Sequence, residues 1–230
     1  MPRLERDGVQ IEYAVRGAGG RTPLLLTHGY SVSGRMWDRN VPALIDDRVV
    51  ITWDLRGHGG SDTPEDPAAY THEACLADME ALLDRAGAAR AVLCGQSLGG
   101  FLSLRMNLEH PERVAGLVIV DAGPGFRDDA AREKWNADAR ERPDGPVREL
   151  LVQHDSLVLD TLDQVSVPTL VVVGSEDRLF LAAAEVMANR IPGAERVVLD
   201  GAGHMANLDA PDEFNVAVND FLEGLWLNGL

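Results

Sequence analysis

The sequence is poor in cysteine, in aromatic residues and in positive charge. Its 230 residues include two cysteines, and phenylalanine, tryptophan and tyrosine together make up 5%. Two cysteines do not build a disulfide framework, so we expect Cys75 and Cys94 to be buried, reduced side chains. Lysine and arginine total 21 against 37 acidic residues, a formal net charge of −16. Such a charge repels phosphate backbones and anionic membranes, so neither nucleic acid nor membrane is an expected partner.

Long hydrophobic runs are absent as well. No apolar stretch approaches the roughly 20 residues that a membrane-spanning helix needs. Residues 1–8 contain no apolar core of the kind that a signal peptide has. We therefore expect a cytoplasmic protein. With 45% hydrophobic and 25% charged residues, the composition is typical of a globular chain, and the length suits one domain.

What the sequence does contain is a series of short apolar runs. Asp7-Gly8 predicts a hairpin turn, and residues 9–15 alternate as a strand after it. Later runs are continuous rather than alternating, which indicates strands buried on both faces of a parallel sheet. They are Leu24–Leu26, Val49–Ile51, Ala91–Cys94, Leu117–Val120, Leu170–Val173 and Arg196–Leu199.

Helical patterns separate these runs. One follows a cap residue at Thr71 and ends at Gly87, and the others cover Leu98–Glu109, Ala182–Arg190 and the stretch after Pro211. Alternation of strands and helices predicts an α/β fold: a mostly parallel central sheet with helices on both faces, preceded by the N-terminal hairpin.

One stretch breaks the alternation, since no strand pattern occurs between Val120 and Val167. Residues 128–142 are charged around Trp135, and a second helical stripe follows over residues 150–162. We interpret residues 123–166 as a small helical cap or lid. The core of the fold would then comprise residues 1–122 and 167–230.

The strongest chemical signal is the segment Gly95-Gln96-Ser97-Leu98-Gly99, which fits G-x-S-x-G. A predicted strand precedes it and a predicted helix follows it. At such a turn the serine takes a strained backbone conformation, and flanking glycines remove side chains that would clash. The hydroxyl of Ser97 is then presented at a helix N-terminus, where developing negative charge is favoured. This predicts a nucleophilic serine.

A serine hydroxyl needs a base, and the base needs an acid. His204 follows the last predicted strand, where a loop can place its imidazole over the strand ends. Asp177 follows the strand at residues 170–173, and the order Ser97, Asp177, His204 is that of α/β-hydrolases. Asp121, after the strand at residues 117–120, is the rival acid, while Glu176 is less favourably placed.

An oxyanion formed by attack on a carbonyl needs hydrogen-bond donors. The backbone N–H of Leu98, directly after the nucleophile, is one predicted donor. The loop His28-Gly29-Tyr30 follows another strand and should supply the second. We assign that donor to the N–H of Tyr30, with Gly29 allowing a close approach.

Together these segments resemble the α/β-hydrolase family, which includes esterases, lactonases, haloperoxidases, epoxide hydrolases and carbon–carbon hydrolases. The resemblance rests on four blocks in family order: His28-Gly29-Tyr30, Asp54–Ser61, Gly95–Gly100, and Gly203-His204-Met205 with Asp177 upstream. In that family the second block is mainly structural, so His58 is not expected to be catalytic.

The resemblance also discriminates among activities. Epoxide hydrolases and haloalkane dehalogenases carry an aspartate at the position of Ser97, so acyl transfer is favoured over an alkyl-enzyme ester. Ser31 stands where cofactor-free haloperoxidases typically have proline, which weakens that alternative. The expected function is cleavage of small carboxylic esters through an acyl-enzyme, without metal or cofactor. Lactone or carbon–carbon hydrolysis on the same triad and a ligand receptor with vestigial turnover are the alternatives.

The substrate pocket is harder to read. Phe126, Trp135, Phe180 and Met205 are candidate pocket residues beside Tyr30 and Leu98, and Leu157 is a candidate lid contact. Their apolar character predicts an uncharged or apolar acyl group. The apolar tail, residues 225–230, is expected to pack on the last helix or, as the lesser option, to form a dimer contact, so a monomer or a homodimer is expected.

Overall fold

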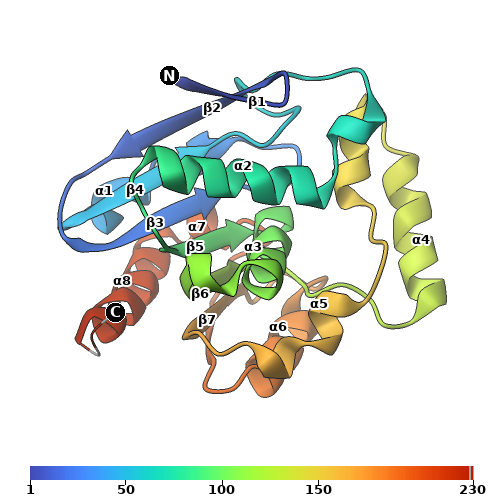
Figure 1. The fold of residues 1–230 in the computed structure, drawn as a ribbon. Helices are drawn as coiled ribbons and strands as arrows, with labels where there is room; N and C mark the ends of the chain where they lie inside the picture. The colour runs from blue at the N-terminus through green and yellow to red at the C-terminus, as the bar shows by residue number, and fades with distance from the viewer. Residues whose placement is uncertain (228, 230) are drawn as a thin grey trace.

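The computed structural model describes residues 1–227 and 229, and within them eight strands form one sheet (Figure 1). Their order across the sheet is β1-β2-β4-β3-β5-β6-β7-β8. β1 and β2, and β2 and β4, pair antiparallel, and all other neighbours pair parallel. The strands are β1 Arg3–Arg6, β2 Val9–Arg16, β3 Arg21–Thr27, β4 Arg48–Trp53, β5 Ala91–Gln96, β6 Val114–Val120, β7 Thr169–Gly174 and β8 Glu195–Leu199.

Helices occupy the connections between the strands, as the sequence predicts. The α-helices are α1 Val41–Leu44, α2 His72–Arg85, α3 Leu98–Glu109, α4 Asp129–Arg140, α5 Leu157–Asp160, α6 Leu181–Arg190, α7 Ala206–Asp209 and α8 Pro211–Leu227. Short 3₁₀ helices are η1 Gly34–Trp37, η2 Pro67–Ala69, η3 Pro111–Arg113, η4 Gly145–Leu151 and η5 Leu162–Gln164. The hydroxyl of Thr71 accepts a 3.1 Å hydrogen bond from the N–H of Ala74, which confirms the predicted cap of α2.

Alternate side chains of the central strands point to opposite faces of the sheet and build two cores. In β3, Leu25 packs into the core that includes residues of α2, α3 and α6, whereas Leu24 and Leu26 belong to the core with α1, α7 and α8. The predicted fold class is therefore confirmed: a mostly parallel sheet with helices on both faces. Cys75 and Cys94 are buried free thiols in these cores, and burial raises the pKa of both.

Two local predictions are wrong. The last strand, β8, is not buried on both faces: it lies at the edge of the sheet, and Val198 is 44% exposed. The second helical stripe is not one helix either, because the chain leaves η4 at Val152 in an extended conformation. There the Asn136 side chain of α4 donates to the carbonyl of Gln153 and accepts from its N–H, both at 2.8 Å. These bonds replace the helical ones.

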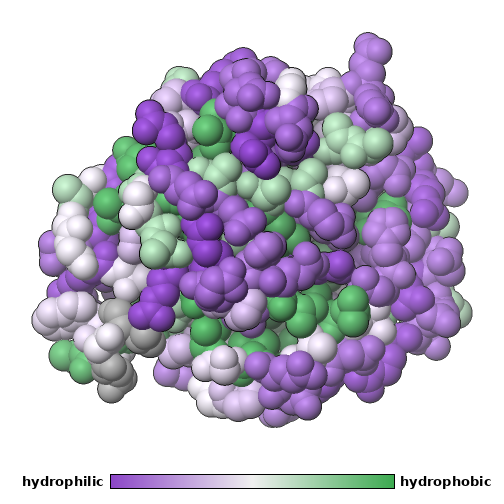
Figure 2. Space-filling view, viewed as in Figure 1, coloured by the Kyte–Doolittle hydropathy of each residue, from purple (hydrophilic) through white to green (hydrophobic). Residues whose placement is uncertain are grey.

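The surface is polar over most of the face in view in Figure 2. Figure 2 shows a face that is mainly hydrophilic, with apolar side chains gathered below α2 where Figure 1 places α3 and α5. No helix in the described part of the chain is long and apolar enough to cross a membrane. At the C-terminal end Leu225 is buried, while Trp226 and Leu227 are 49% and 76% exposed. The rest of the predicted tail contact, at residues 228 and 230, lies outside the described residues.

Candidate active site

The predicted site residues gather at the carboxyl ends of four neighbouring strands. Ser97 follows β5, Asp121 follows β6, Asp177 lies just beyond β7, and His204 lies beyond β8. Parallel strands present these ends along one edge of the sheet, which is where ligands bind in open α/β folds. The topology thus brings together residues that are up to 107 positions apart in the sequence, Ser97 and His204.

Ser97 sits at a sharp turn between β5 and α3. Its backbone has φ 52° and ψ −114°, a region that non-glycine residues rarely adopt. A side chain at Gly95 would overlap the backbone of Gly99, and one at Gly99 would overlap the carbonyl of Thr27. The N–H of Ser97 donates to the carbonyl of Val120 on β6 at 2.9 Å, which anchors the turn to the sheet. The strained turn is the one that the pentapeptide predicts.

His204 is hydrogen-bonded to Asp177. The imidazole Nδ1 lies 2.8 Å from Oδ2 of Asp177, whose side chain is 4% exposed, while that of His204 is 45% exposed. The ring of Phe180 stacks on the imidazole with centroids 5.1 Å apart and planes 18° apart. Nδ1 therefore faces the carboxylate, and the rest of the ring lines the same cavity as Ser97.

Asp121, the rival acid, is engaged elsewhere. Its two carboxylate oxygens accept 2.8 Å hydrogen bonds from the N–H groups of Gly174 and Ala206. Burial raises the pKa of Asp121 to about 6, against the opposing effect of these two donors. Both oxygens tie the end of β7 to α7, so the hydrogen-bond pattern favours Asp177 as the partner of His204.

Gln96 is a site residue that sequence reasoning missed. Its side chain is buried, and Nε2 donates a 2.7 Å hydrogen bond to the backbone carbonyl of His204. The position lies inside the G-x-S-x-G segment, where its polar side chain at the end of a buried strand was an available signal. The bond ties the loop of the imidazole to the turn of Ser97.

His28 holds the loop that carries the second predicted oxyanion donor. Its Nδ1 lies 2.6 Å from the carbonyl oxygen of Gly29, and its Nε2 accepts from the N–H of Leu55 at 2.9 Å. Nδ1 therefore carries the proton, and burial lowers the pKa of His28 to about 3, so the ring is neutral. In a trans peptide the N–H of Tyr30 points away from the Gly29 carbonyl, hence away from His28. A side chain at Gly29 would lie 3.2 Å from Cβ of Ser97, which places this loop beside the nucleophile.

The second block of the resemblance has the structural role that was expected. The carboxylate of Asp54 accepts from the N–H groups of Gly34 and Gly60, both at 2.7 Å. Arg56 forms a buried bidentate pair with Asp78 of α2 at 2.6 and 2.8 Å. His58 is buried against the carbonyl of Arg56, outside the cavity with Ser97.

A cavity of about 530 Å³ lies in front of Ser97 and His204. Three of the four candidate pocket residues, Phe126, Trp135 and Phe180, line it. Met205 instead lines a neighbouring hollow, and Leu157 is 48% exposed outside the cavity. The remaining apolar wall comes from Leu98, Phe101, Leu150, Leu151, Leu179 and Ala183, and the polar groups that sequence reasoning missed are Asp138, Arg142 and Gln153.

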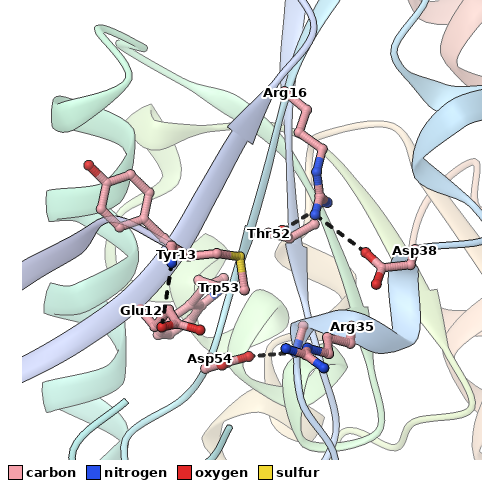
Figure 3. A pocket seen from close by; sticks show the side chains of 10 residues that line it. Glu12, Tyr13, Arg16, Arg35, Asp38, Thr52, Trp53 and Asp54 are labelled. Atoms are coloured by element: carbon pink, nitrogen blue, oxygen red, sulfur yellow. Dashed lines mark hydrogen bonds and ion pairs between the residues drawn. The ribbon is translucent and has the colours of Figure 1, made fainter. Parts of the chain in front are cut away.

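A second hollow near the N-terminal strands is too small for a substrate. It encloses about 10 Å³, roughly the space of one water molecule. Several of its polar groups pair with one another (Figure 3): Arg16 pairs with Asp38 and donates to Thr52, and the N–H of Gly34 donates to Asp54. This hollow is part of the framework.

Comparison with known proteins places the chain in a family. Residues 22–162, more than half of the chain, match the model of the α/β-hydrolase fold family, and the protein belongs to that family. It is 27% identical to 3-oxoadipate enol-lactonase 2 of Acinetobacter baylyi over 94% of both chains. It is 27% identical to a putative carbamate hydrolase of Caulobacter vibrioides over 95% of this chain and 96% of the other.

Solved structures agree. A thermophilic esterase from Thermogutta terrifontis, crystallised with malate, superposes with a TM-score of 0.80. The two sequences are 25% identical, and the match covers 98% of this chain and 99% of the other. All three of these relatives are named for hydrolytic activities. The family and these relatives support the assignment of the protein as a hydrolase.

Proposed function

We propose that the protein is a serine hydrolase that cleaves carboxylic esters through an acyl-enzyme. The observation that carries the proposal is the 2.8 Å contact between His204 Nδ1 and the buried Asp177, in a cavity that also contains the strained Ser97. With Nδ1–H held by a carboxylate, the other ring nitrogen is the free base that a serine nucleophile requires.

In the proposed mechanism, the hydroxyl oxygen of Ser97 attacks the ester carbonyl carbon while His204 Nε2 takes its proton. The N–H groups of Leu98 and Tyr30 stabilise the tetrahedral oxyanion. As the intermediate collapses, the C–O bond to the alcohol breaks, and His204 returns the proton to the leaving oxygen. Water, deprotonated by the same imidazole, then attacks the acyl-enzyme and releases the acid and Ser97. Asp177 stays ionised throughout.

Lactone hydrolysis is the second candidate, because a full-length relative is an enol-lactonase. The same groups would open a cyclic ester, and the leaving alcohol would stay attached to the acid. A panel of p-nitrophenyl esters of increasing acyl length, with a γ-lactone and a β-diketone, separates ester, lactone and carbon–carbon cleavage. A higher kcat/KM for the lactone than for every linear ester would favour the second candidate.

We also propose that residues 123–166 act as a small cap over the site, on a core of residues 1–122 and 167–230. The cap includes α4, η4, α5 and η5 and contributes Phe126, Trp135 and Leu151 to the wall of the cavity. It is fastened to the core by His72 of α2, whose Nε2 lies 3.0 Å from the carbonyl of Leu150.

The test of the catalytic assignment combines labelling and kinetics. A fluorophosphonate probe should modify Ser97 alone, as peptide mass spectrometry would show. Ser97→Ala should abolish labelling and lower kcat for p-nitrophenyl butyrate by on the order of 10³-fold or more, with an unchanged Tm. Ser166→Ala, at an exposed serine outside the cavity, is the matched control. Esterase turnover that survives in Ser97→Ala would overturn the proposal, and an unlabelled, folded wild type would favour a ligand receptor.

A further inference from the structure

The cavity contains one cation that ester hydrolysis does not use. Arg142 is the only lysine or arginine among the residues that line it. Arg142 follows α4, in the segment proposed as the cap, and its side chain reaches back toward the core. In the described part of the chain, the guanidinium forms no hydrogen bond and no ion pair, and its one contact is with an aromatic ring.

That contact holds the guanidinium in place. Its central carbon lies 5.1 Å from the centroid of the Tyr30 ring, in a cation–π arrangement. The ring is itself fixed, because the phenol of Tyr30 donates a 3.0 Å hydrogen bond to Asp144. The carbonyl of Arg142 accepts a 2.9 Å hydrogen bond from Arg148, which fixes the backbone. A guanidinium packed on a ring keeps its N–H donors free for a planar acceptor.

The charges around Arg142 leave it without a partner. Asp138, one helical turn earlier, also lines the cavity, but in the described part of the chain it forms no ion pair with the guanidinium. Asp144 accepts the phenol of Tyr30 instead. Arg142 is an exposed residue that lines the cavity beside apolar side chains. A guanidinium with free N–H donors there is suited to a carboxylate, which it binds through two parallel hydrogen bonds.

Tyr30 relates this cation to the reaction centre. Its N–H is the proposed oxyanion donor beside Ser97, and its ring carries Arg142 at the other end of the same residue. If the carbonyl carbon of a substrate lies at Ser97, the length of the Tyr30 side chain separates that carbon from the guanidinium of Arg142. Between the two points the cavity wall is apolar, with Phe126, Trp135 and Leu151 available to cover methylene groups.

From these contacts we propose that Arg142 binds a free carboxylate at the far end of the acyl group. The substrates would be esters or lactones whose acyl chain ends in a second, ionised carboxyl group, as in half-esters of dicarboxylic acids. This replaces the uncharged acyl group expected from the sequence. It rests on the proposed function, since it assumes that the scissile carbonyl is bound at Ser97.

The test compares a negatively charged substrate with an uncharged ester of the same carbon chain. Monomethyl adipate and dimethyl adipate have the same carbon chain and differ in the free carboxylate. Wild type should have the higher kcat/KM for the half-ester. Arg142→Gln should lower that value by about tenfold or more and leave the diester within about twofold. Half-esters of succinate and suberate then report the preferred spacing.

Matched variants separate a local contact from a general change of charge. Arg140→Gln removes one positive charge from the same helix end at an exposed residue outside the cavity, and should change neither substrate. Asp138→Asn should raise kcat/KM for the half-ester only, because it removes a competing negative charge. Equal losses on both esters in Arg142→Gln would show that the arginine merely supports Tyr30, and would overturn the carboxylate site.

A binding measurement distinguishes this proposal from the one it rests on. Calorimetric titration with adipate should give a Kd that Arg142→Gln weakens about tenfold and Arg140→Gln leaves unchanged. If wild type hydrolyses p-nitrophenyl butyrate but shows neither adipate binding nor preference for the half-ester, the carboxylate site is wrong and the ester hydrolase stands. If adipate binds through Arg142 but no ester is cleaved, the site stands and the proposed reaction is wrong.

Discussion

The side-chain amide of Gln96 donates a 2.7 Å hydrogen bond to the backbone carbonyl of His204. Gln96 is the last residue of β5 and precedes Ser97, so one bond joins the turn of the proposed nucleophile to the loop of the proposed base. The bond acts on the backbone of His204, while Asp177 acts on its ring. The imidazole is thus held from two sides.

Replacing Gln96 with Met should lower activity without unfolding the protein. Methionine has a similar volume but no donor, so the His204 carbonyl loses its partner and the loop gains freedom. A displaced general base typically loses one to two orders of magnitude in rate. We expect kcat for p-nitrophenyl butyrate to fall about tenfold or more with a small change in KM. Gln164→Met, at an exposed glutamine, is the control, and unchanged kcat in Gln96→Met would refute a positioning role.

Substitution of Asp177 and of Asp121, the two aspartates at this edge of the sheet, should affect different properties: activity for Asp177 and stability for Asp121. Asp177→Asn keeps the shape of the side chain but favours the wrong imidazole tautomer, so kcat should fall by on the order of 10³- to 10⁴-fold with little change in Tm. Asp121→Asn should mainly lower Tm, because an amide has one acceptor oxygen for the N–H groups of Gly174 and Ala206. Measured kcat and Tm for both variants decide the assignment. The reverse pattern would make Asp121 the catalytic acid.

The fold was predictable because its signals are local and repeated. Continuous apolar runs such as Leu170–Val173 suit a strand with helices on both faces, and the turn at Ser97 is set by neighbouring glycines. The burial of β8 was predicted wrongly. Its apolar residues resemble those of a buried strand, but β8 lies at the edge of the sheet with no further strand beside it, and Val198 is exposed.

The cap was predicted in outline and missed in detail. The apolar spacing over residues 150–162 favours a helix. However, the side-chain amide of Asn136 forms hydrogen bonds with the backbone N–H and carbonyl of Gln153, so the chain does not continue as a helix after η4. That contact joins positions 17 residues apart, and no local pattern announces it. Arg142 was missed for a related reason. A charged residue in a charged run predicts an exposed surface position, and Arg142 is exposed, but only the fold shows that its guanidinium packs on the Tyr30 ring at the cavity.

Replacing Gln153 tests whether an unpaired polar group in the cavity wall lowers the stability of the protein. Its side-chain oxygen is buried in the cavity wall without a hydrogen-bond partner in the described part of the chain. An unsatisfied buried polar group destabilises a fold by about 1–3 kcal/mol. Gln153→Met should therefore leave Tm unchanged or raise it, since the backbone bonds to Asn136 remain. Differential scanning fluorimetry measures this directly, and a clear fall in Tm would mean that the amide is satisfied in the folded protein.

Buried histidines should make the protein sensitive to mild acid. Burial lowers the pKa of His28 to about 3 and also lowers the pKa values of His58 and His72, so folding disfavours protonation of all three. The unfolded chain protonates them below about pH 6.5. It then binds more protons than the folded state, and stability falls as the pH drops, by at most about 1.4 kcal/mol per pH unit for His28.

Asp121 and Asp78 have the opposite effect on the pH dependence of stability. Burial raises the pKa of both. That of Asp121 is raised to about 6, so between about pH 4 and 6 the folded state holds on Asp121 a proton that the unfolded state has lost. The His28 effect is at least as large as the opposing Asp121 effect, and His58 and His72 add to it, so we expect a net loss of stability between pH 6.5 and 5. Urea unfolding at pH 7.5, 6.5, 5.8 and 5 would measure this loss. His72→Gln can still donate to the Leu150 carbonyl and should flatten the pH dependence. A urea midpoint that is constant from pH 7.5 to 5 would contradict the effect of the buried histidines.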